Sequence, residues 1–261
     1  MQKSQLIVSL TSYPARINTV PVVIESLLNQ TYHADKIILW LNPESFPNKE
    51  KDLPSQLLKL QSLGLIIGWY KNIRSYTKLI PTLKMYPDAT IITVDDDILY
   101  PRNLIRNLIR THHRYPNDIC AHRVRKILTQ NGIIADYNKW TLSERRGIFS
   151  RWRSGYDNLL CGVGGVLYPP HSLHPDVMKS DIFTKLCKHQ DDVWFWAMAV
   201  INNRKIVPTK RGYNMQKRTI KSVQSTGLWT NINGTENSPN NTAIENCIKY
   251  YPDLKIKLGL E

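Results

Sequence analysis

In the first half of the chain, short runs of apolar residues alternate with stretches in which apolar residues recur at helical spacing. The apolar runs predict buried strands at 6–10, 36–41, 65–70 and 90–94. Between them, apolar residues three or four positions apart predict helices at 20–29, 53–63 and 78–85, although Pro81 falls inside the last one. Strands that alternate with helices form a mostly parallel sheet covered on both faces. The pattern therefore predicts an α/β protein.

The second half has a less regular pattern. It predicts a helix at 102–115, strands and a hairpin within 119–134, and a helix at 193–201 that is apolar on nearly every face. Asn131-Gly132 is the turn signal of the hairpin. The stretch at 226–241 is rich in Asn, Thr, Gly and Ser and predicts a loop.

Composition bounds the size and the kind of partner. With 261 residues and 42% hydrophobic content, the chain can form one large domain or two small ones. Lys and Arg number 35 against 21 Asp and Glu, a net charge of +14, so an anionic partner is expected: a nucleotide, a nucleic acid or an acidic membrane surface. The charge alone does not choose among these.

Two further features predict a cytoplasmic protein. The four cysteines are far apart and form no C-x-x-C pair, which argues against a zinc module and a dense disulfide framework. The strand at 6–10 leaves no room for a signal peptide, and the apolar stretch at 193–201 is too short to span a bilayer. We expect any membrane contact to be peripheral.

Three consecutive aspartates, Asp95, Asp96 and Asp97, follow the predicted strand at 90–94. Adjacent carboxylates at a partly desolvated edge repel one another, so hydrogen bonds or a divalent cation must compensate them. On an extended backbone Asp95 and Asp97 point one way and Asp96 the other. Such oxygen ligands suit Mg²⁺ or Mn²⁺ better than zinc. The alternative is that one aspartate caps the helix at 102–115.

Other candidate groups also have two interpretations. In parallel sheets ligands gather at the carboxyl ends of strands, where the loop 11–16 and the aspartate triplet both lie, but this loop is equally well a plain strand-to-helix turn. Asp191 and Asp192 open an apolar helix, where capping and the helix dipole favour acids. The glycines at 162–165 allow either a close approach to a ligand or a tight bend. Lys78, taken alone, is a surface charge.

Four motifs in chain order carry a resemblance: Ser9–Arg16, Lys78, Asp95–Asp97 and Gln190–Val193. Together they resemble the GT-A class of nucleotide-sugar-dependent glycosyltransferases. The stretch Cys161–Pro170, followed by Asp191–Trp196, is similar to the small bacterial enzymes that build capsular and surface polysaccharides. The resemblance covers roughly residues 5 to 205.

The resemblance implies a single GT-A, Rossmann-like catalytic domain over 1–261. Its mostly parallel sheet and flanking helices would form a nucleotide-sugar-binding half at 1–100, followed by a less regular acceptor and catalytic half at 101–225 and a C-terminal loop and tail at 226–261. It implies a hexosyltransferase-like enzyme that moves a sugar from a nucleotide-sugar donor, in our expectation UDP-linked, to a hydroxyl of a glycan or lipid-linked glycan. Whether transfer inverts or retains the anomeric centre stays open.

The resemblance also implies roles for individual residues. Asp97 contacts Mn²⁺ or Mg²⁺, Asp95 contacts the metal or the ribose, and the cation neutralises the departing diphosphate. The remaining donor-binding residues are Thr11, Ser12, Tyr13, Arg16, Lys78 and Asp96. Asp192 accepts the proton of the acceptor hydroxyl while Asp191 binds acceptor hydroxyls, or the two exchange roles. Acceptor contacts are expected from Gly164, Gly165 and Trp194, with Trp152, Tyr156 and Trp196 as further candidates for stacking on sugar faces. The alternative for these aromatic residues is a place in the core, which is more frequent in a buried helix.

One departure from the class concerns the metal. Many GT-A enzymes complete the coordination with a histidine near the C-terminus, whereas the last histidine here is His189. The alternatives for that position are Asn231, Asn233, a water or no protein group. The basic segment Lys205–Lys221 either closes over the diphosphate or binds anionic lipid headgroups.

The principal alternative is a metal-dependent nuclease or phosphotransferase, since clustered aspartates and a positive net charge also describe enzymes that act on nucleic acid. A non-catalytic nucleic-acid-binding module would use the charge but leave both acidic groups unexplained, and the sequence carries no motif of that kind. We therefore expect no nucleic-acid partner.

Overall fold

A computed structural model describes residues 4–143, 153–210, 212–222 and 238–260. The strands are β1 Leu6–Thr11, β2 Lys36–Leu41, β3 Leu65–Trp69, β4 Thr90–Thr93, β5 Ile119–Ala121, β6 Val124–Lys126, β7 Thr129–Gln130, β8 Ile133–Ile134, β9 Thr141–Leu142, β10 Asn158–Leu160, β11 Val166–Tyr168 and β12 Ile206–Pro208. The α-helices are α1 Val20–Leu28, α2 Ser55–Lys59, α3 Ile80–Met85, α4 Leu104–Arg114, α5 Ser180–Leu186, α6 Asp191–Ile201, α7 Pro239–Tyr250 and α8 Asp253–Leu258.

A seven-stranded sheet in the order β12-β5-β11-β4-β1-β2-β3 organises the molecule. All neighbours in it are parallel except β11, which runs antiparallel to both β4 and β5. Because β11 is reversed, its first residue lies at the same edge as the carboxyl ends of β1 and β4. The loop before β11 therefore reaches the edge at which we expected a ligand.

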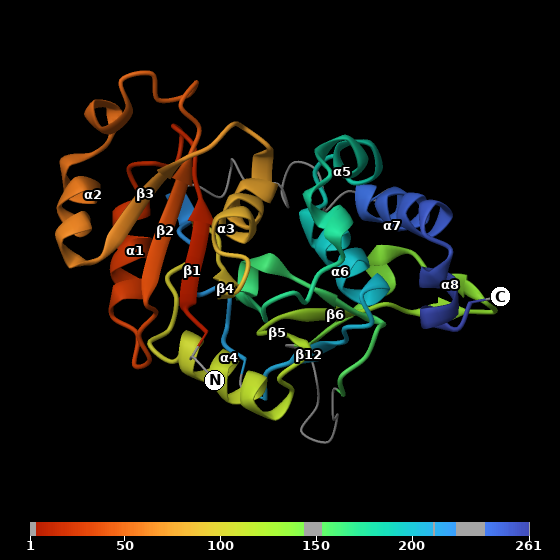
Figure 1. The fold of residues 1–261 in the computed structure, drawn as a ribbon. Coiled ribbons are helices and arrows are strands. Elements are labelled where there is room, and N and C mark those ends of the chain that lie inside the picture. The colour runs from red at the N-terminus through yellow and green to blue at the C-terminus, as the bar shows by residue number, and fades with distance from the viewer. Residues whose placement is uncertain (1–3, 144–152, 211, 223–237, 261) are drawn as a thin grey trace.

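Side chains of the central strands alternate between two hydrophobic clusters, one on each face of the sheet. Leu6, Val8 and Leu10 of β1 join the cluster that includes α1, α2 and α4, while Ile7 joins the cluster that includes α3 and α6. Figure 1 shows α1 and α2 on one side of β1–β3 and α3 on the other. The predicted α/β class, a mostly parallel sheet flanked by helices, is confirmed.

The first half follows the predicted order, and the helix ends differ for local reasons. The helix predicted at 53–63 is split into α2 and a 3₁₀ turn, Leu60–Leu63, which ends at Gly64 with φ 107°. The helix predicted at 78–85 begins only at Ile80, because Pro81 is accommodated in a first turn, and the 3₁₀ turn Arg74–Lys78 precedes it.

The second half contains one confirmed local prediction and one that is wrong. Strands β7 and β8 form a hairpin around Asn131 and Gly132, whose φ values of 52° and 74° are those of a type I′ turn. The C-terminal part, expected to be a loop and tail, instead contains α7 and α8. Ser238 caps α7 by accepting a bond from the Asn240 N–H, so polar residues interpreted as loop form a helix start. Residues 226–237 of the expected loop lie outside the described residues.

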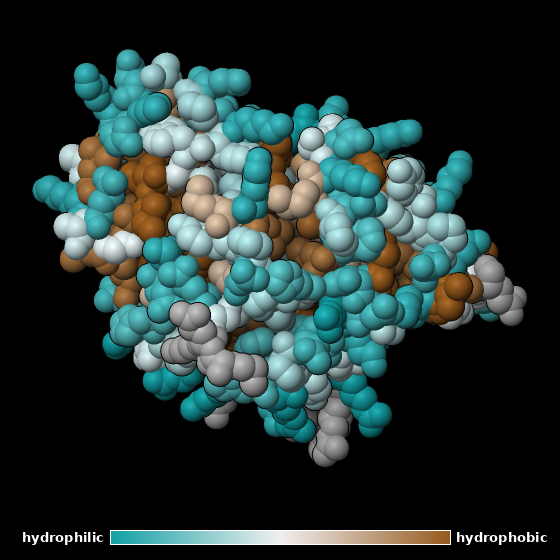
Figure 2. All heavy atoms as spheres, in the orientation of Figure 1, coloured by the Kyte–Doolittle hydropathy of each residue, from teal (hydrophilic) through white to brown (hydrophobic). Residues whose placement is uncertain are grey.

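The C-terminal helices pack beside α6 in the half of the molecule away from β1–β3 (Figure 1). On the face drawn in Figure 2, hydrophilic residues cover most of the outer surface and hydrophobic ones show in bands between them. None of the helices described is both long enough and hydrophobic enough to cross a bilayer.

Candidate functional site

The aspartate triplet lies directly after β4, in the turn at the carboxyl edge of the sheet. Asp96 is buried there and is held by the first loop: Ser12 Oγ donates to its Oδ2 at 2.6 Å, and Arg16 Nη1 donates to its Oδ1 at 2.7 Å. Loop 11–16 thus provides the counter-ion for the triplet. It is more than a plain turn, because Arg16 is itself buried.

Arg16 pairs with two aspartates at once. Its Nη1 lies 3.1 Å from Asp97 Oδ2 as well as 2.7 Å from Asp96. Burial lowers the pKa of Arg16, but the charges of Asp96 and Asp97 outweigh burial and raise it overall. The predicted alternation, with Asp96 pointing away from Asp95 and Asp97, is wrong, since Asp96 and Asp97 lie in a turn rather than in a strand. None of the three caps α4, which begins after Asn103.

Lys78 joins the triplet to the second acidic pair. Its ammonium lies 2.9 Å from Asp95 Oδ1, to which it donates a hydrogen bond, and 3.0 Å from Asp191 Oδ2 in an ion pair. Lys78 is only 5% exposed, so its interpretation as a surface charge is wrong. Burial lowers the pKa of Lys78, but the charges of Asp191, Asp95 and Asp192 raise it overall.

Gly162 brings the loop before β11 against this centre. The Gly162 N–H donates to Asp192 Oδ1 at 3.0 Å. A Cβ at Gly162 would lie 2.7 Å from Lys78 Nζ and 2.8 Å from Asp192 Oδ1, closer than real Cβ contacts. Only glycine leaves room for both charged groups at this point.

Two tyrosines that the sequence did not single out fix the same loop. The Tyr100 hydroxyl accepts from the Asp95 N–H at 2.8 Å and donates to Val163 O at 3.2 Å. Tyr213 donates from its hydroxyl to Gly164 O at 2.9 Å. Both tyrosines come from segments that flank the acidic turn in space, and no local sequence pattern distinguishes them from core tyrosines.

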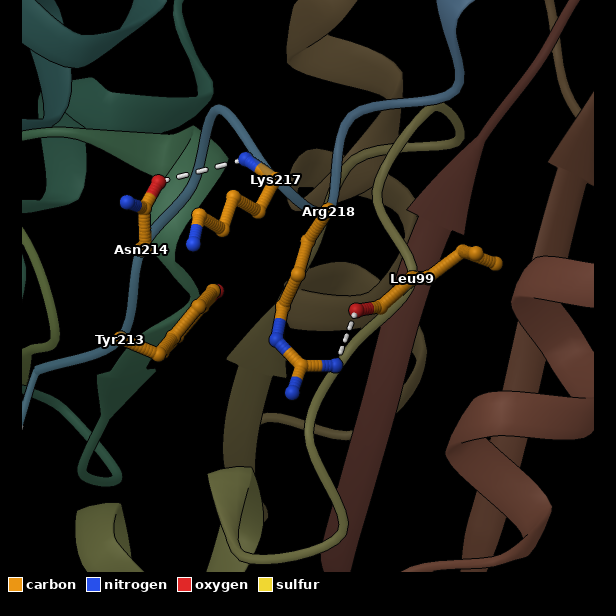
Figure 3. Close-up of a pocket in the computed structure, with 5 residues that line it drawn as sticks. All are labelled: Leu99, Tyr213, Asn214, Lys217 and Arg218. Carbon is orange, nitrogen blue, oxygen red and sulfur yellow. Dashed lines mark hydrogen bonds between the residues drawn. The ribbon is translucent and has the colours of Figure 1, made fainter.

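Part of the basic segment Lys205–Lys221 lies against the acidic turn. The Ile220 N–H donates to Asp97 O at 2.8 Å, and the Leu99 N–H donates to Arg218 O at 2.9 Å. A pocket of about 370 Å³ opens beside this pairing, and its lining residues are Leu99, Tyr213, Asn214, Lys217 and Arg218. Figure 3 shows the side chains of Tyr213, Lys217 and Arg218 projecting into one space, where Arg218 donates to Leu99 O.

The residues of the triplet fit a divalent cation in part. Within the described ranges no group of three or more His, Cys, Asp and Glu side chains is arranged to hold a metal, and Asp95 and Asp96 form ion pairs with Lys78 and Arg16. Asp97 Oδ1, however, is buried and has no hydrogen-bond partner in the described structure. An unpaired carboxylate oxygen in that position is a suitable ligand for Mn²⁺ or Mg²⁺. Asn231 and Asn233 lie outside the described residues.

Burial raises the pKa of three carboxylates of the site, Asp96, Asp97 and Asp192. Burial raises the pKa of Asp97 to about 6, the charge of Asp95 adds to this, and Arg16 opposes it. Burial raises the pKa of Asp192 to about 8, the charge of Asp191 adds to this, and Lys78 opposes it. Five carboxylates, Asp95–Asp97 and Asp191–Asp192, thus share the two cations Arg16 and Lys78.

The expected aromatic acceptor contacts need correction. Trp194 is 0% exposed and donates from Nε1 to Val177 O, so it belongs to the core and cannot stack on a sugar. Trp196 is likewise buried and bonds to Tyr156 O. An apolar helix surrounded by other elements buries its aromatic residues on every side. Trp152 lies outside the described residues.

The two glycines expected to bind acceptor meet protein atoms. A Cβ at Gly164 would lie 2.7 Å from Arg123 Cβ, and one at Gly165, where φ is 86°, would lie 3.0 Å from Leu104. Close packing therefore explains both glycines, and a contact with the acceptor stays a prediction. In the first loop, Thr11 donates to Trp40 O, and Tyr13 is exposed beside the Arg16 guanidinium.

Comparison with known proteins shows the fold alone. No protein-family model and no curated protein sequence matches the chain. The structure is similar to the crystal structure of S. aureus TarS 1–349, with a TM-score of 0.51 and 13% identity over 80% of this chain and 59% of that one. The complex of TarS 1–349 with UDP gives a TM-score of 0.49 at 13% identity over the same shares.

A third similar structure is CMP:2-keto-3-deoxy-manno-octonic acid synthetase complexed with CTP, with a TM-score of 0.47 and 10% identity over 82% of this chain and 95% of that one. The chain spans about three fifths of the TarS fragment that it matches. Its fold is of the GT-A, Rossmann-like α/β type.

The raised pKa of Asp192 predicts how the stability of the metal-free protein depends on pH. The folded state keeps a proton on Asp192 up to a pH of about 8, whereas the unfolded state releases it near its ordinary pKa of 3.8. The free energy of unfolding therefore falls as pH rises between these values, by at most about 1.4 kcal/mol per pH unit. Asp97, with a pKa of about 6, lowers the free energy of unfolding in the same way, but only up to a pH of about 6.

Urea unfolding at pH 6, 7 and 8 with a chelator tests this expectation. The free energy of unfolding should fall less steeply in Asp192→Asn than in the wild type. Asp181→Asn, at an exposed position on α5, is the matched control and should follow the wild type. Equal slopes for the wild type and Asp192→Asn contradict the assignment.

Proposed function

We propose that this chain is a metal-assisted glycosyltransferase that moves a sugar from a nucleotide-sugar donor to a hydroxyl of a glycan acceptor in bacterial surface polysaccharide synthesis. The observation that carries the proposal is the meeting of two acidic groups, Asp95–Asp97 and Asp191–Asp192, at the carboxyl edge of a parallel sheet. Ligands of α/β proteins bind at this edge. One acidic group serves the donor and the other serves the acceptor.

On the donor side, Asp97 and Asp95 would hold Mn²⁺ or Mg²⁺. The unpartnered Oδ1 of Asp97 and the excess of carboxylates over cations support this assignment. The cation supplies positive charge to the departing diphosphate. TarS, which shares the fold, has been crystallised with UDP, so UDP is the first nucleoside diphosphate to test.

The pocket beside the acidic turn supports the same assignment. Lys217 and Arg218 line it, and neither forms an ion pair with an acidic side chain among the described residues. In our proposal the basic segment closes over the diphosphate and excludes water there, while Ser12 and Arg16 keep Asp96 in place.

On the acceptor side, Asp192 takes the proton of the attacking hydroxyl. A pKa of about 8 lies near a neutral working pH, which favours a group that must both accept and release a proton. Asp191 is engaged by Lys78, so Asp192 is the better placed of the two. A cytoplasmic reaction on a lipid-linked glycan, with the basic surface facing anionic headgroups, is consistent with the net charge of +14.

A donor screen tests the proposal directly. The protein is mixed with Mn²⁺ and a panel of nucleotide sugars, with and without a mixture of glycan acceptors, and the release of nucleoside diphosphate is measured. We expect release from one donor class, faster with acceptor. Cleavage of DNA without any donor, together with no thermal stabilisation by a nucleoside diphosphate, would instead identify a metal-dependent nuclease.

Replacing Asp97 tests the donor site. Asp97→Ala should weaken the binding of UDP in the presence of Mn²⁺ by about tenfold or more, because a charged metal ligand is removed, while metal-free binding stays the same. Titration calorimetry measures both. Asp88→Ala, an exposed aspartate before the start of β4, is the control at the opposite edge of the sheet. Unchanged affinity of Asp97→Ala with Mn²⁺ refutes the role.

Replacing Asp192 tests the acceptor site. Asp192→Asn should lower turnover by about 10² or more, the scale of a general base, and leave the binding of UDP with Mn²⁺ unchanged. The screen identifies the donor with which turnover is measured. Turnover close to that of the wild type would remove Asp192 from the mechanism.

A further inference from the structure

Lys78 lies between the two acidic groups, and contacts of its own 3₁₀ turn fix its position. It ends the 3₁₀ turn Arg74–Lys78, whose Tyr76 donates a hydrogen bond to Cys187 O. The Tyr76 ring stacks on Phe183 at 4.0 Å between ring centroids. The turn is therefore locked against the connection between α5 and α6, only a few residues before Asp191.

The ammonium of Lys78 is enclosed by carboxylates from two segments, the residues that follow β4 and the first turn of α6. It contacts Asp95 Oδ1 at 2.9 Å and Asp191 Oδ2 at 3.0 Å. The absent Cβ of Gly162 marks a point 2.7 Å from Nζ and 2.8 Å from Asp192 Oδ1, so Asp192 borders the same space. A lysine that is 5% exposed and surrounded in this way has no room to project into solvent toward a nucleotide.

The two neighbouring aspartates of α6 have different partners. Asp191 is engaged by the lysine, whereas Asp192 accepts a hydrogen bond from the neutral Gly162 N–H. A carboxylate held by a cation is a poor base, because the cation stabilises its ionised form. This difference in partners gives the two adjacent aspartates different chemistry.

We propose that Lys78 is a positioning residue for the transfer step: it ties Asp95 on the donor side to Asp191 on the acceptor side and leaves Asp192 to take the acceptor proton. The proposal rests on the proposed function and deepens it. It departs from the role in nucleotide binding that the resemblance implies for Lys78.

Burial and Asp191 raise the pKa of Asp192, and the positive charge of Lys78 opposes them and lowers it. Without this charge, Asp192 faces uncompensated carboxylates and keeps its proton to a higher pH, so a smaller fraction of Asp192 is ionised at pH 7 and able to accept the proton of the acceptor hydroxyl. The groups that interact electrostatically with Asp192 in the described structure are Asp191, Lys78, Asp95, the Gly162 N–H and the hydroxyls of Tyr76, Tyr137 and Tyr168.

Variants of Lys78 separate a positioning role from nucleotide binding. Lys78→Met removes the charge at similar length, Lys78→Arg keeps the charge, and Lys84→Met at an exposed position of α3 is the matched control. For each variant, kcat and KM are measured from pH 6 to 9 with the donor found in the screen, and UDP binding with Mn²⁺ is measured by calorimetry.

Lys78→Met should lower kcat at pH 7 by about tenfold or more and move the acidic limb of the kcat profile upward by about one pH unit or more. Its affinity for UDP with Mn²⁺ should change by less than about threefold, because the lost interaction acts in the transfer step. Lys78→Arg should keep the acidic limb of the kcat profile near its wild-type position. Its kcat should be reduced, because the larger arginine side chain crowds Gly162. Lys84→Met should match the wild type.

A second pair of variants covers the case in which Lys78→Met does not fold because buried acids are left unpaired. Asp191→Asn and the double variant Lys78→Met/Asp191→Asn both reduce the acidic charge, and they differ only in the lysine. The acidic limb of the double variant should lie at higher pH than that of Asp191→Asn. Coincident limbs overturn the proposal.

The other outcomes are equally distinct. Lys78→Met loses UDP affinity tenfold or more, about the scale of one lost charged contact, if Lys78 is a nucleotide ligand. Such a loss, with the acidic limb of the kcat profile unmoved, overturns the proposal. Equal loss of activity at every pH makes its role merely structural and also overturns it. The proposed function itself is refuted if the wild-type protein neither binds UDP with Mn²⁺ nor releases any nucleoside diphosphate. Only the role of Lys78 is refuted if the wild type is active and the acidic limb of the kcat profile does not move in the variants.

Discussion

The site depends on one electrostatic constraint: five carboxylates gather at one edge of a sheet beside two buried cations, and four of the five form ion pairs with them. Arg16 compensates Asp96 and Asp97 from the first loop, and Lys78 joins Asp95 to Asp191. Burial raises the pKa of Asp97 and of Asp192, and the neighbouring acids Asp95 and Asp191 add to this, which destabilises the ionised folded state. Arrangements of charged groups that lower stability are found in proteins mostly at binding and catalytic sites.

The sheet was predictable because its signals are local. Strands β1 and β4 are buried on both faces and appear in the sequence as short apolar runs, and the order of strands and helices follows from such runs. The position of Asp95–Asp97 at a strand end follows in the same way. The Asn131-Gly132 hairpin was predictable because its φ values suit those two residues.

The remaining features arise from contacts between residues far apart in sequence. Nothing near Lys78 in the sequence shows that Asp191 will face it, and so the sequence pattern favoured a surface charge. For Trp194 the apolar helix already favoured a place in the core over a contact with a sugar, and the structure buries it completely. The helices α7 and α8 were missed because a short polar cap, Ser238, resembles loop composition.

The reversed strand β11 is what turns the acidic edge into a closed site. In a purely parallel sheet the carboxyl ends of β4 and its neighbour would carry loops leading outward to helices. Because β11 runs the other way, its preceding loop returns to the edge, where Gly162 meets Asp192 and Lys78 and Tyr100 binds Val163 O. The acids of α6 are thereby held against those that follow β4, although the two groups lie on different halves of the chain. Topology, rather than any single motif, creates the juxtaposition of acidic groups on which the proposed transfer depends.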